Sequence, residues 1–173
     1  TIDEIAKEVG EFDFILADLG VSSMQIDNPK RGFSFKTDGP LDLRLNQEAG
    51  ISAARRLDTI SREELAGMLY ENSDEPYCEE LAKAITDEIR RGNHIDTTTK
   101  LRQVIEKTLD FLPEKEKKET IKKTCQRTFQ ALRIDVNHEF EVLYEFMEKL
   151  PDALRPGGRV AILTFHSGED KLV

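Results

Sequence analysis

Two short apolar runs, one near each end of the chain, constrain its fold more than any other feature. The first, residues 12–18, ends at Asp18, and the second, residues 159–166, ends at His166. Neither run alternates apolar and polar residues cleanly, which is typical of strands buried on both faces of a parallel sheet. Ligands of open α/β sheets bind beyond the carboxyl ends of the strands. We therefore expect Asp18 and His166 to face a ligand site.

Two strands are too few to bury both of their faces or to be stable by themselves. We therefore expect partner strands from residues outside this sequence or from another chain. The chain begins with Thr1 rather than Met, which agrees with a fragment of a longer protein.

Length and composition narrow the classes of protein that the chain can belong to. Its 173 residues and 38% hydrophobic content predict one domain, or one domain with an insertion. The two cysteines and three histidines show no ligand-like spacing, so no metal site is predicted. The sequence contains neither an 18-residue apolar run nor a leader peptide, and we expect a cytoplasmic protein without a membrane anchor.

The net charge of −9 argues against binding of nucleic acid through overall charge alone. The charge is unevenly distributed, however, because residues 113–133 contain seven basic and three acidic residues. This basic segment would either be an ordinary helix face exposed to solvent or form an RNA-binding surface.

The residues between the two strands follow a helical pattern. We expect a short helix over residues 2–9, a long loop over residues 19–46, and helices at about 61–70, 76–91, 98–110 and 114–123. A long helix is predicted over residues 127–150, with an apolar stripe that packs on the sheet: Phe129, Leu132, Val136, Phe140, Leu143, Met147 and Leu150. Pro156, Gly157 and Gly158 are predicted to turn the chain into the second strand.

Several residues have chemistry suited to a site. Phe33 and Phe35 lie among basic residues of the long loop, where they would either stack on bases or anchor the loop to the core. A second, polar stripe lies on one helix face and consists of Gln126, Gln130, Arg133 and Asn137. These side chains would either act together in a site or be ordinary polar residues that face solvent. Neither GxGxxG, GxxxxGK[ST], GxSxG nor HExxH is present, which gives little support to dehydrogenase, kinase or hydrolase functions.

Five segments in register resemble the RsmH (MraW) family of S-adenosylmethionine-dependent methyltransferases of small-subunit ribosomal RNA. They are residues 18–23, 31–35, 38–44, 127–134 with Asn137, and 156–167. The resemblance implies an α/β fold, namely a partial class I (Rossmann-like) methyltransferase sheet with an all-helical insertion subdomain. Residues 1–26 and 127–173 would form the core, and residues 27–126 the loop and insertion.

The resemblance also implies a reaction, a cofactor and site residues. The family methylates N4 of a cytosine, and Asp18 and Gln25 fall on positions that contact S-adenosyl-L-methionine. Candidates for contact with the target amine are Asn137, His166 and Ser167, besides Asp18. The expected substrate-binding residues are Arg31, Phe33, Phe35, Arg44, Arg127 and Arg133.

The family's glycine-rich cofactor loop would lie upstream of Thr1, so we expect this chain to be inactive alone. Gly168 replaces the leucine that the family usually carries, which predicts a looser segment there. The expected partner is ribosomal RNA or the small ribosomal subunit. The alternatives are a non-catalytic RNA-binding fragment and a protein-interaction fragment, with a homodimer as a further option.

Overall fold

The computed structural model describes all 173 residues, Thr1–Val173, and they form two compact units. One unit consists of Thr1–Gly20 and His138–Val173, and the other consists of Val21–Asn137. Each unit has an apolar core of its own. The division predicted from the sequence, with boundaries at residues 26 and 127, stays a prediction.

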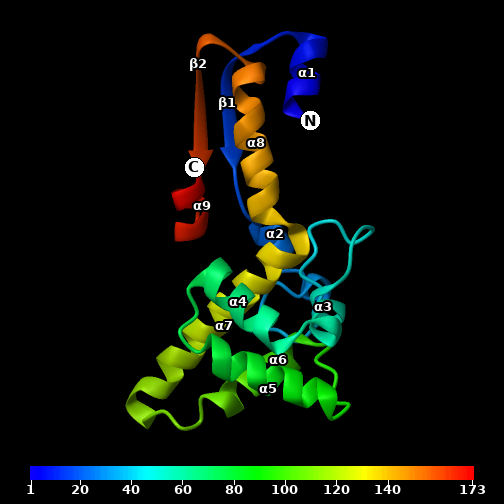
Figure 1. Cartoon of the computed structure of the whole chain (residues 1–173), viewed down its shortest axis with the longest axis vertical. Coiled ribbons are helices and arrows are strands. Elements are labelled where there is room, and N and C mark those ends of the chain that lie inside the picture. The colour runs from blue at the N-terminus through cyan, green and yellow to red at the C-terminus, as the bar shows by residue number, and fades with distance from the viewer. The chain divides into compact units, whose positions relative to one another are not determined.

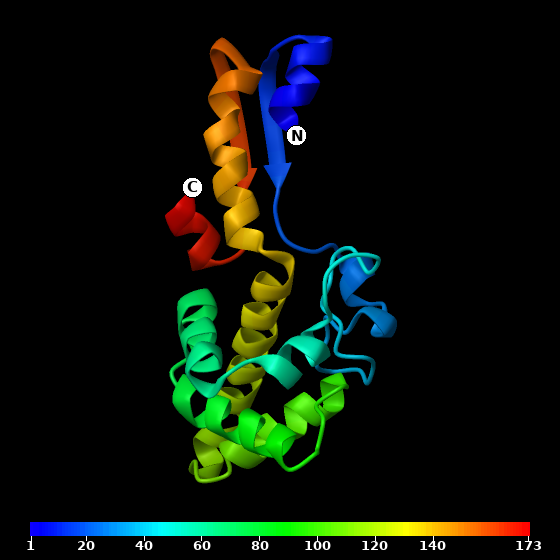
Figure 2. The ribbon, with the colours of Figure 1, turned by 45° about the vertical axis from the view of Figure 1, so that its right-hand side comes forward.

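The first unit is a parallel strand pair with helices. It contains α1 (Ile2–Val9), β1 (Phe12–Asp18), α8 (Glu139–Ala153), β2 (Leu154–Leu163) and α9 (Ser167–Leu172). β1 and β2 lie side by side and run in the same direction, with α1 and α8 beside them (Figure 1; Figure 2). The core of this unit is formed by Ala6, Ile15, Leu150 and Ala153. The helix expected over residues 2–9 and the parallel pairing of the two strands are confirmed.

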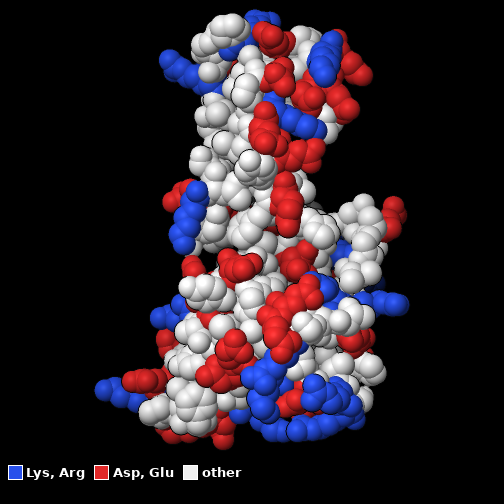
Figure 3. Space-filling model, in the orientation of Figure 1, with Lys and Arg blue, Asp and Glu red and all other residues white.

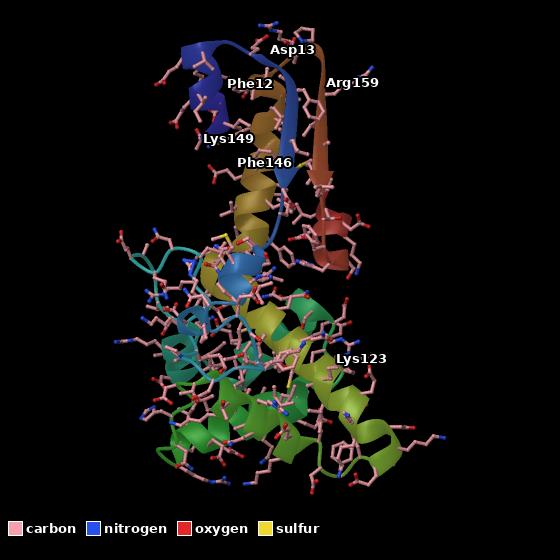
Figure 4. The ribbon with its side chains drawn as sticks, turned by 180° about the vertical axis from the view of Figure 1, so that it is seen from behind. Phe12, Asp13, Lys123, Phe146, Lys149 and Arg159 are labelled. Carbon is pink, nitrogen blue, oxygen red and sulfur yellow. The ribbon has the colours of Figure 1, made fainter.

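An ion-pair cluster joins α1 and α8. Lys149 of α8 contacts Glu145 at 2.6 Å and Asp3 of α1 at 3.8 Å. Figure 4 shows Lys149 on the side of α8 that faces α1.

The second strand differs from its prediction at both ends. β2 begins at Leu154, and the pairing shifts register between Phe12, opposite Leu154, and Phe14, opposite Arg159. The predicted turn before the strand is therefore wrong, because residues 156–158 form an irregularity within β2. The strand ends at Leu163, so His166 lies three residues beyond it.

One face of the strand pair is not covered by the helices of its own unit. The side chains of Phe14, Leu16 and Leu163 are 58%, 61% and 50% exposed. Large apolar side chains at this exposure in a strand indicate a surface that is covered by something else in the working protein.

The second unit is helical. It contains α2 (Ser23–Ile26), the 3₁₀ helix η1 (Pro29–Arg31), α3 (Ala53–Thr59), α4 (Arg62–Ser73), α5 (Cys78–Arg90), α6 (Thr98–Thr108) and α7 (Glu114–Asn137). The helices expected from about residues 61 and 98 are confirmed as α4 and α6, whose N-caps are Ser61 and Thr97; each cap side chain accepts a hydrogen bond from a backbone N–H in the first turn. The core includes Leu57, Leu69, Leu81, Leu101 and Leu132, which are at most 1% exposed.

The prediction of one helix over residues 127–150 is wrong. α7 runs without a break from Glu114 through residues 124–127 and ends at Asn137, and α8 starts at Glu139. His138 between them is left-handed, with φ 50° and ψ 42°, which interrupts the helical hydrogen bonds. The predicted apolar stripe is therefore divided between two cores, with Phe129 and Leu132 in the helical unit and Leu150 in the strand unit.

No helix in the structure combines the length and the apolar character that crossing a membrane requires.

Candidate functional site

Asp18 is the last residue of β1, at the carboxyl edge of the parallel pair. The pairing continues one residue further, because Leu19 N donates to the Leu163 carbonyl at 3.2 Å. The Asp18 carboxylate is exposed and has no hydrogen bond or ion pair within the chain. It is therefore free to accept hydrogen bonds from a ligand.

His166 follows the carboxyl end of β2 and caps α9. Its Nδ1 accepts a hydrogen bond from Glu169 N at 3.4 Å, which places the proton of the neutral ring on Nε2. Nε2 lies 3.2 Å from Glu169 Oε1, although this contact lacks the alignment of a hydrogen bond. The ring also packs against Phe140, with centroids 6.0 Å apart. His166 is thus held by a hydrogen bond at Nδ1 and by Phe140 on one face of its ring.

Glu169 is a buried acid that the sequence analysis did not identify. It is 4% exposed, and its Oε2 accepts a hydrogen bond from Phe165 N at 2.8 Å. One carboxylate therefore contacts two of the three residues between β2 and α9, Phe165 and His166. The available signal was an acid three residues after a histidine at a helix start, a spacing that brings the two side chains together.

Glu139, His166 and Glu169 have potential ligand atoms within 4.8 Å of one another. Zinc binding through Nε2 would require that nitrogen to be deprotonated. The hydrogen bond accepted by Nδ1 favours the opposite tautomer, and Glu139 has another interaction. The group is best described as a polar network that orders α9.

Gly168 lies in tight contact with this network. A Cβ atom there would lie 2.7 Å from Phe140 Cζ and 3.1 Å from His166 Nδ1. The expectation of a looser segment at this position is wrong, since the glycine allows the histidine and phenylalanine rings to approach the backbone closely. Ser167 beside it is exposed, and its hydroxyl has no partner within the chain.

In the helical unit, Asn137 holds the loop that precedes α3. Its Oδ1 accepts from Leu45 N at 2.7 Å, and its Nδ2 donates to the carbonyls of Leu43 at 2.7 Å and Arg133 at 2.8 Å. All of its strong hydrogen-bonding groups are engaged within this unit.

Two of the predicted substrate-binding arginines also hold this loop. Arg31 donates to the Leu45 carbonyl at 3.0 Å. Arg44 donates to both carboxylate oxygens of Asp42, at 2.7 and 3.0 Å. Burial would raise the pKa of Asp42, but the hydrogen bonds from Arg44 and Gln47 outweigh burial and hold the pKa below its ordinary value.

A pocket of about 500 Å³ opens in the helical unit between the loop and α7. Its lining includes the aromatic rings of Phe33 and Phe35 and three members of the predicted polar stripe, Gln126, Gln130 and Arg133. Phe35 packs edge-on against Phe129, with centroids 5.8 Å apart, so it anchors the loop and lines the pocket at once. The structure thus brings together five residues whose sequence pattern had left two interpretations open.

Arg127 and Gln25 have structural partners as well. Arg127 lies 3.9 Å from the carboxylate of Glu75, which is completely buried. Burial raises the pKa of Glu75, against hydrogen bonds from Tyr77 N and the Thr124 hydroxyl. The Gln25 side-chain oxygen accepts from Ser22 N at 2.9 Å in the cap of α2, which leaves its amide NH₂ group free to donate.

A parallel strand pair with a free carboxylate at its carboxyl edge, together with a helical unit, makes this a mixed α/β protein, a class in which ligands bind beyond the carboxyl ends of the strands. In a comparison with protein families, the model described as "MraW methylase family" matches residues 1–173. The chain belongs to the MraW methylase family.

Its relatives are named for their action on ribosomal RNA. The chain is 88% identical to "Ribosomal RNA small subunit methyltransferase H 1" of Agathobacter rectalis, over the whole chain and 50% of that protein. It is 76% identical to the protein of the same name from Lachnoclostridium phytofermentans, over 99% of the chain and 47% of the relative. A Bacteroides fragilis relative is 44% identical over 96% of the chain. The chain spans about half the length of these relatives.

Proposed function

We propose that the protein containing these residues transfers a methyl group from S-adenosyl-L-methionine to N4 of a cytosine in small-subunit ribosomal RNA. The observation that carries the proposal is the 88% identity, over every residue, with a ribosomal RNA small subunit methyltransferase. Because the chain spans half of that relative, the activity is proposed for the whole protein. Such a substrate would place the activity in the cytoplasm.

The proposed chemistry depends on alignment more than on an activated protein nucleophile. The cytosine amine is weakly nucleophilic because its lone pair is delocalised into the ring, whereas the sulfonium already activates the methyl group. Holding the two reacting atoms in line can supply on the order of 7–11 kcal/mol. A carboxylate or hydroxyl that accepts a hydrogen bond from the amine would add to this.

The strand pair is proposed to be part of a Rossmann-like sheet. Its bare apolar face and its unpaired edges fit the addition of further strands and helices from the rest of the protein. The cofactor would then bind beyond the carboxyl ends of the strands, where Asp18 offers a free carboxylate. Gln25 is proposed to donate to the cofactor through its free amide group. This chain alone is proposed to lack turnover.

The roles of the other candidate residues follow from their contacts. Ser167 has a free hydroxyl and Asp18 a free carboxylate, so these two are proposed to contact the target amine. His166 accepts a hydrogen bond at Nδ1 and packs on Phe140, and it is proposed to order the segment that follows the strand. Asn137 is proposed to act through the loop that it holds, since its amide has no free group for a substrate.

RNA recognition is proposed for the pocket of the helical unit. Phe33 and Phe35 offer ring surfaces to an unstacked base, and Arg133 offers charge. Arg127 is 40% exposed and remains a proposed phosphate contact, whereas Arg31 and Arg44 would act only by shaping the loop. A non-catalytic RNA-binding role is the second candidate, because this pocket is complete within the chain.

Calorimetric titration of S-adenosyl-L-methionine tests the assignment of Asp18. The whole protein is expected to bind, and Asp18→Asn to bind at least tenfold more weakly. Asp13→Asn is the matched control, because Asp13 lies at the opposite end of β1 in an exposed ion pair with Arg155. Equal affinity of Asp18→Asn and the unmodified protein would contradict the assignment.

A further inference from the structure

The lysines in the first half of α7 fall into two groups. Lys117 pairs with Asp110 at 3.1 Å and Glu114 at 2.9 Å, and Lys123 lies 3.7 Å from Glu119. Lys115, Lys118 and Lys122 are exposed and have no ion pair or hydrogen bond. Figure 4 shows Lys123 on α7.

The three unpaired lysines share one side of α7. Their spacing of three and then four residues brings side chains to the same face of a helix. We name them the lysine row. Since α7 continues without a break from Glu114 to Asn137, the same spacing leads onward from Lys122 to Gln126, Gln130 and Arg133.

The lysine row therefore leads to the pocket of the helical unit, whose lining includes Gln126, Gln130 and Arg133. From residue 115 to residue 133 the helix rises about 27 Å, at about 1.5 Å per residue. One helix thus presents a row of free cations and then a pocket with aromatic and amide groups. All of these residues belong to one compact unit.

Each part of this face suits a different part of an RNA strand. Lysine ammonium groups neutralise phosphates without sequence preference. The rings of Phe33 and Phe35 suit stacking of an unpaired base, and the amides of Gln126 and Gln130 can donate to and accept from its edge. A volume of about 500 Å³ is within the range of small-ligand pockets and fits one base with its sugar.

We propose that a single-stranded segment of RNA lies along α7, with its phosphates on the lysine row and one base in the pocket. This inference rests on the proposed function for its source of RNA, and it assigns the backbone contact to a surface outside the strand-end site. The acidic groups nearest in sequence are Glu114, Glu116 and Glu119, of which Glu114 and Glu119 are neutralised by lysines outside the row. Figure 3 shows acidic and basic side chains interspersed over the helical unit. Because the net charge of the chain is −9, RNA phosphates would be attracted only where basic side chains are locally unpaired, as in the lysine row.

The test replaces Lys115, Lys118 and Lys122 together with glutamine in this chain. Binding of a fluorescent single-stranded RNA is measured at several salt concentrations. Loss of three phosphate contacts should weaken binding and lower the slope of log Kd against log salt by about 2, at about 0.7 per contact. Circular dichroism checks that the variant is folded.

The matched control replaces Lys83, Lys100 and Lys149 with glutamine. It changes the net charge by the same amount, but each of these lysines already pairs with an acid four residues away. Its salt slope should stay at the value of the unmodified chain. Equal slopes for the two triple variants, or no salt-dependent RNA binding by the unmodified chain, would overturn the proposal.

Gln126→Ala separates the pocket from the lysine row. This exposed residue lines the pocket and carries no charge, so its loss should weaken RNA binding without changing the salt slope. An unchanged affinity would remove the pocket from the proposal.

Methylation assays of the whole protein distinguish this inference from the proposed function. Loss of the lysine row should raise KM for ribosomal RNA and leave kcat unchanged, because the row contacts only the backbone. An unmodified whole protein without any methylation activity would refute the proposed function, while the RNA-binding measurements would still decide the role of the lysine row.

Discussion

The side-chain amide of Asn137 holds Leu43 in a left-handed backbone conformation. Asn137 Nδ2 donates to the Leu43 carbonyl at 2.7 Å, and Leu43 has φ 64° although it is a bulky residue that is 1% exposed. Such a conformation costs about 1–2 kcal/mol per residue and persists only where its surroundings impose it. The contact therefore links the end of α7 to a wall of the pocket, which Leu43 lines.

Asn137→Ala should destabilise the helical unit by about 1–3 kcal/mol, because the Leu43 carbonyl and Leu45 N–H would lose their partner. Urea unfolding of the chain measures the effect. Gln126→Ala is the control, since Gln126 lies on the same helix face with an exposed side chain. If both variants unfolded at the same urea concentration, Asn137 would not hold the loop.

Asp42→Asn should destabilise the chain by about 1.5–3 kcal/mol at pH 7, through loss of the charged hydrogen bonds from Arg44. Because the folded state lowers the pKa of Asp42, its contribution is fully present above the ordinary pKa of 3.8. The contribution is lost as the pH falls through the lower pKa of the folded protein. The difference between the two unfolding free energies should therefore stay constant as long as the pH is above the ordinary pKa of 3.8 and shrink only below it, and a difference that already shrinks close to neutral pH would contradict this account.

Glu75→Gln should stabilise the chain at neutral pH, whereas Asp42→Asn should destabilise it. Burial raises the pKa of Glu75, so the stability it contributes is present below the ordinary pKa of 4.5 and is lost as the pH rises through the folded value. Glutamine removes the buried charge and keeps an oxygen for Tyr77 N, so the variant should be more stable than the unmodified chain at pH 7. The gain should shrink toward pH 4.5.

Glu79→Gln is the control for that comparison, because Glu79 is 68% exposed and lies 4.0 Å from Arg62. It should leave the pH dependence unchanged. A Glu75→Gln variant that is less stable than the unmodified chain at pH 7 would show that Arg127 stabilises the charged form more than burial penalises it.

Gly168→Ala should destabilise the strand unit by about 1–3 kcal/mol, since the added Cβ would lie 2.7 Å from Phe140 Cζ. Phe140→Leu removes the clashing atom. In a double-mutant cycle, adding Gly168→Ala to Phe140→Leu should therefore cost less than it does in the unmodified chain. Thermal unfolding of the four proteins checks this, and strictly additive effects would rule out the contact.

The elements that the sequence predicted well are those marked by caps and apolar periodicity. Ser61 and Thr97 begin helices as expected, and β1 ends at Asp18 as expected. The boundary at His138 carries no such signal, because neither glycine nor proline interrupts the pattern there. His138 has a left-handed backbone conformation, which residue propensities alone do not predict.

The candidate site was harder to predict for a related reason. Residue type identified polar side chains such as Arg44 and Asn137, but it could not show that their partners lie within the same loop. The two loop residues that Asn137 holds, Leu43 and Leu45, are more than 90 positions away from it in sequence. Conversely, Glu169 appeared to be an ordinary helix-start acid, and only its burial reveals that it holds Phe165 and His166.

The residues of this chain are proposed to form part of a ribosomal RNA cytosine-N4 methyltransferase. The most direct test incubates small-subunit ribosomal RNA with S-adenosyl-L-methionine and the protein at the full length of its relatives, with this chain alone in parallel, and identifies methylated nucleosides by mass spectrometry. The account predicts N4-methylcytidine with the full-length protein and none with the chain alone. Methylation at another atom or base, or none with the full-length protein, would contradict it.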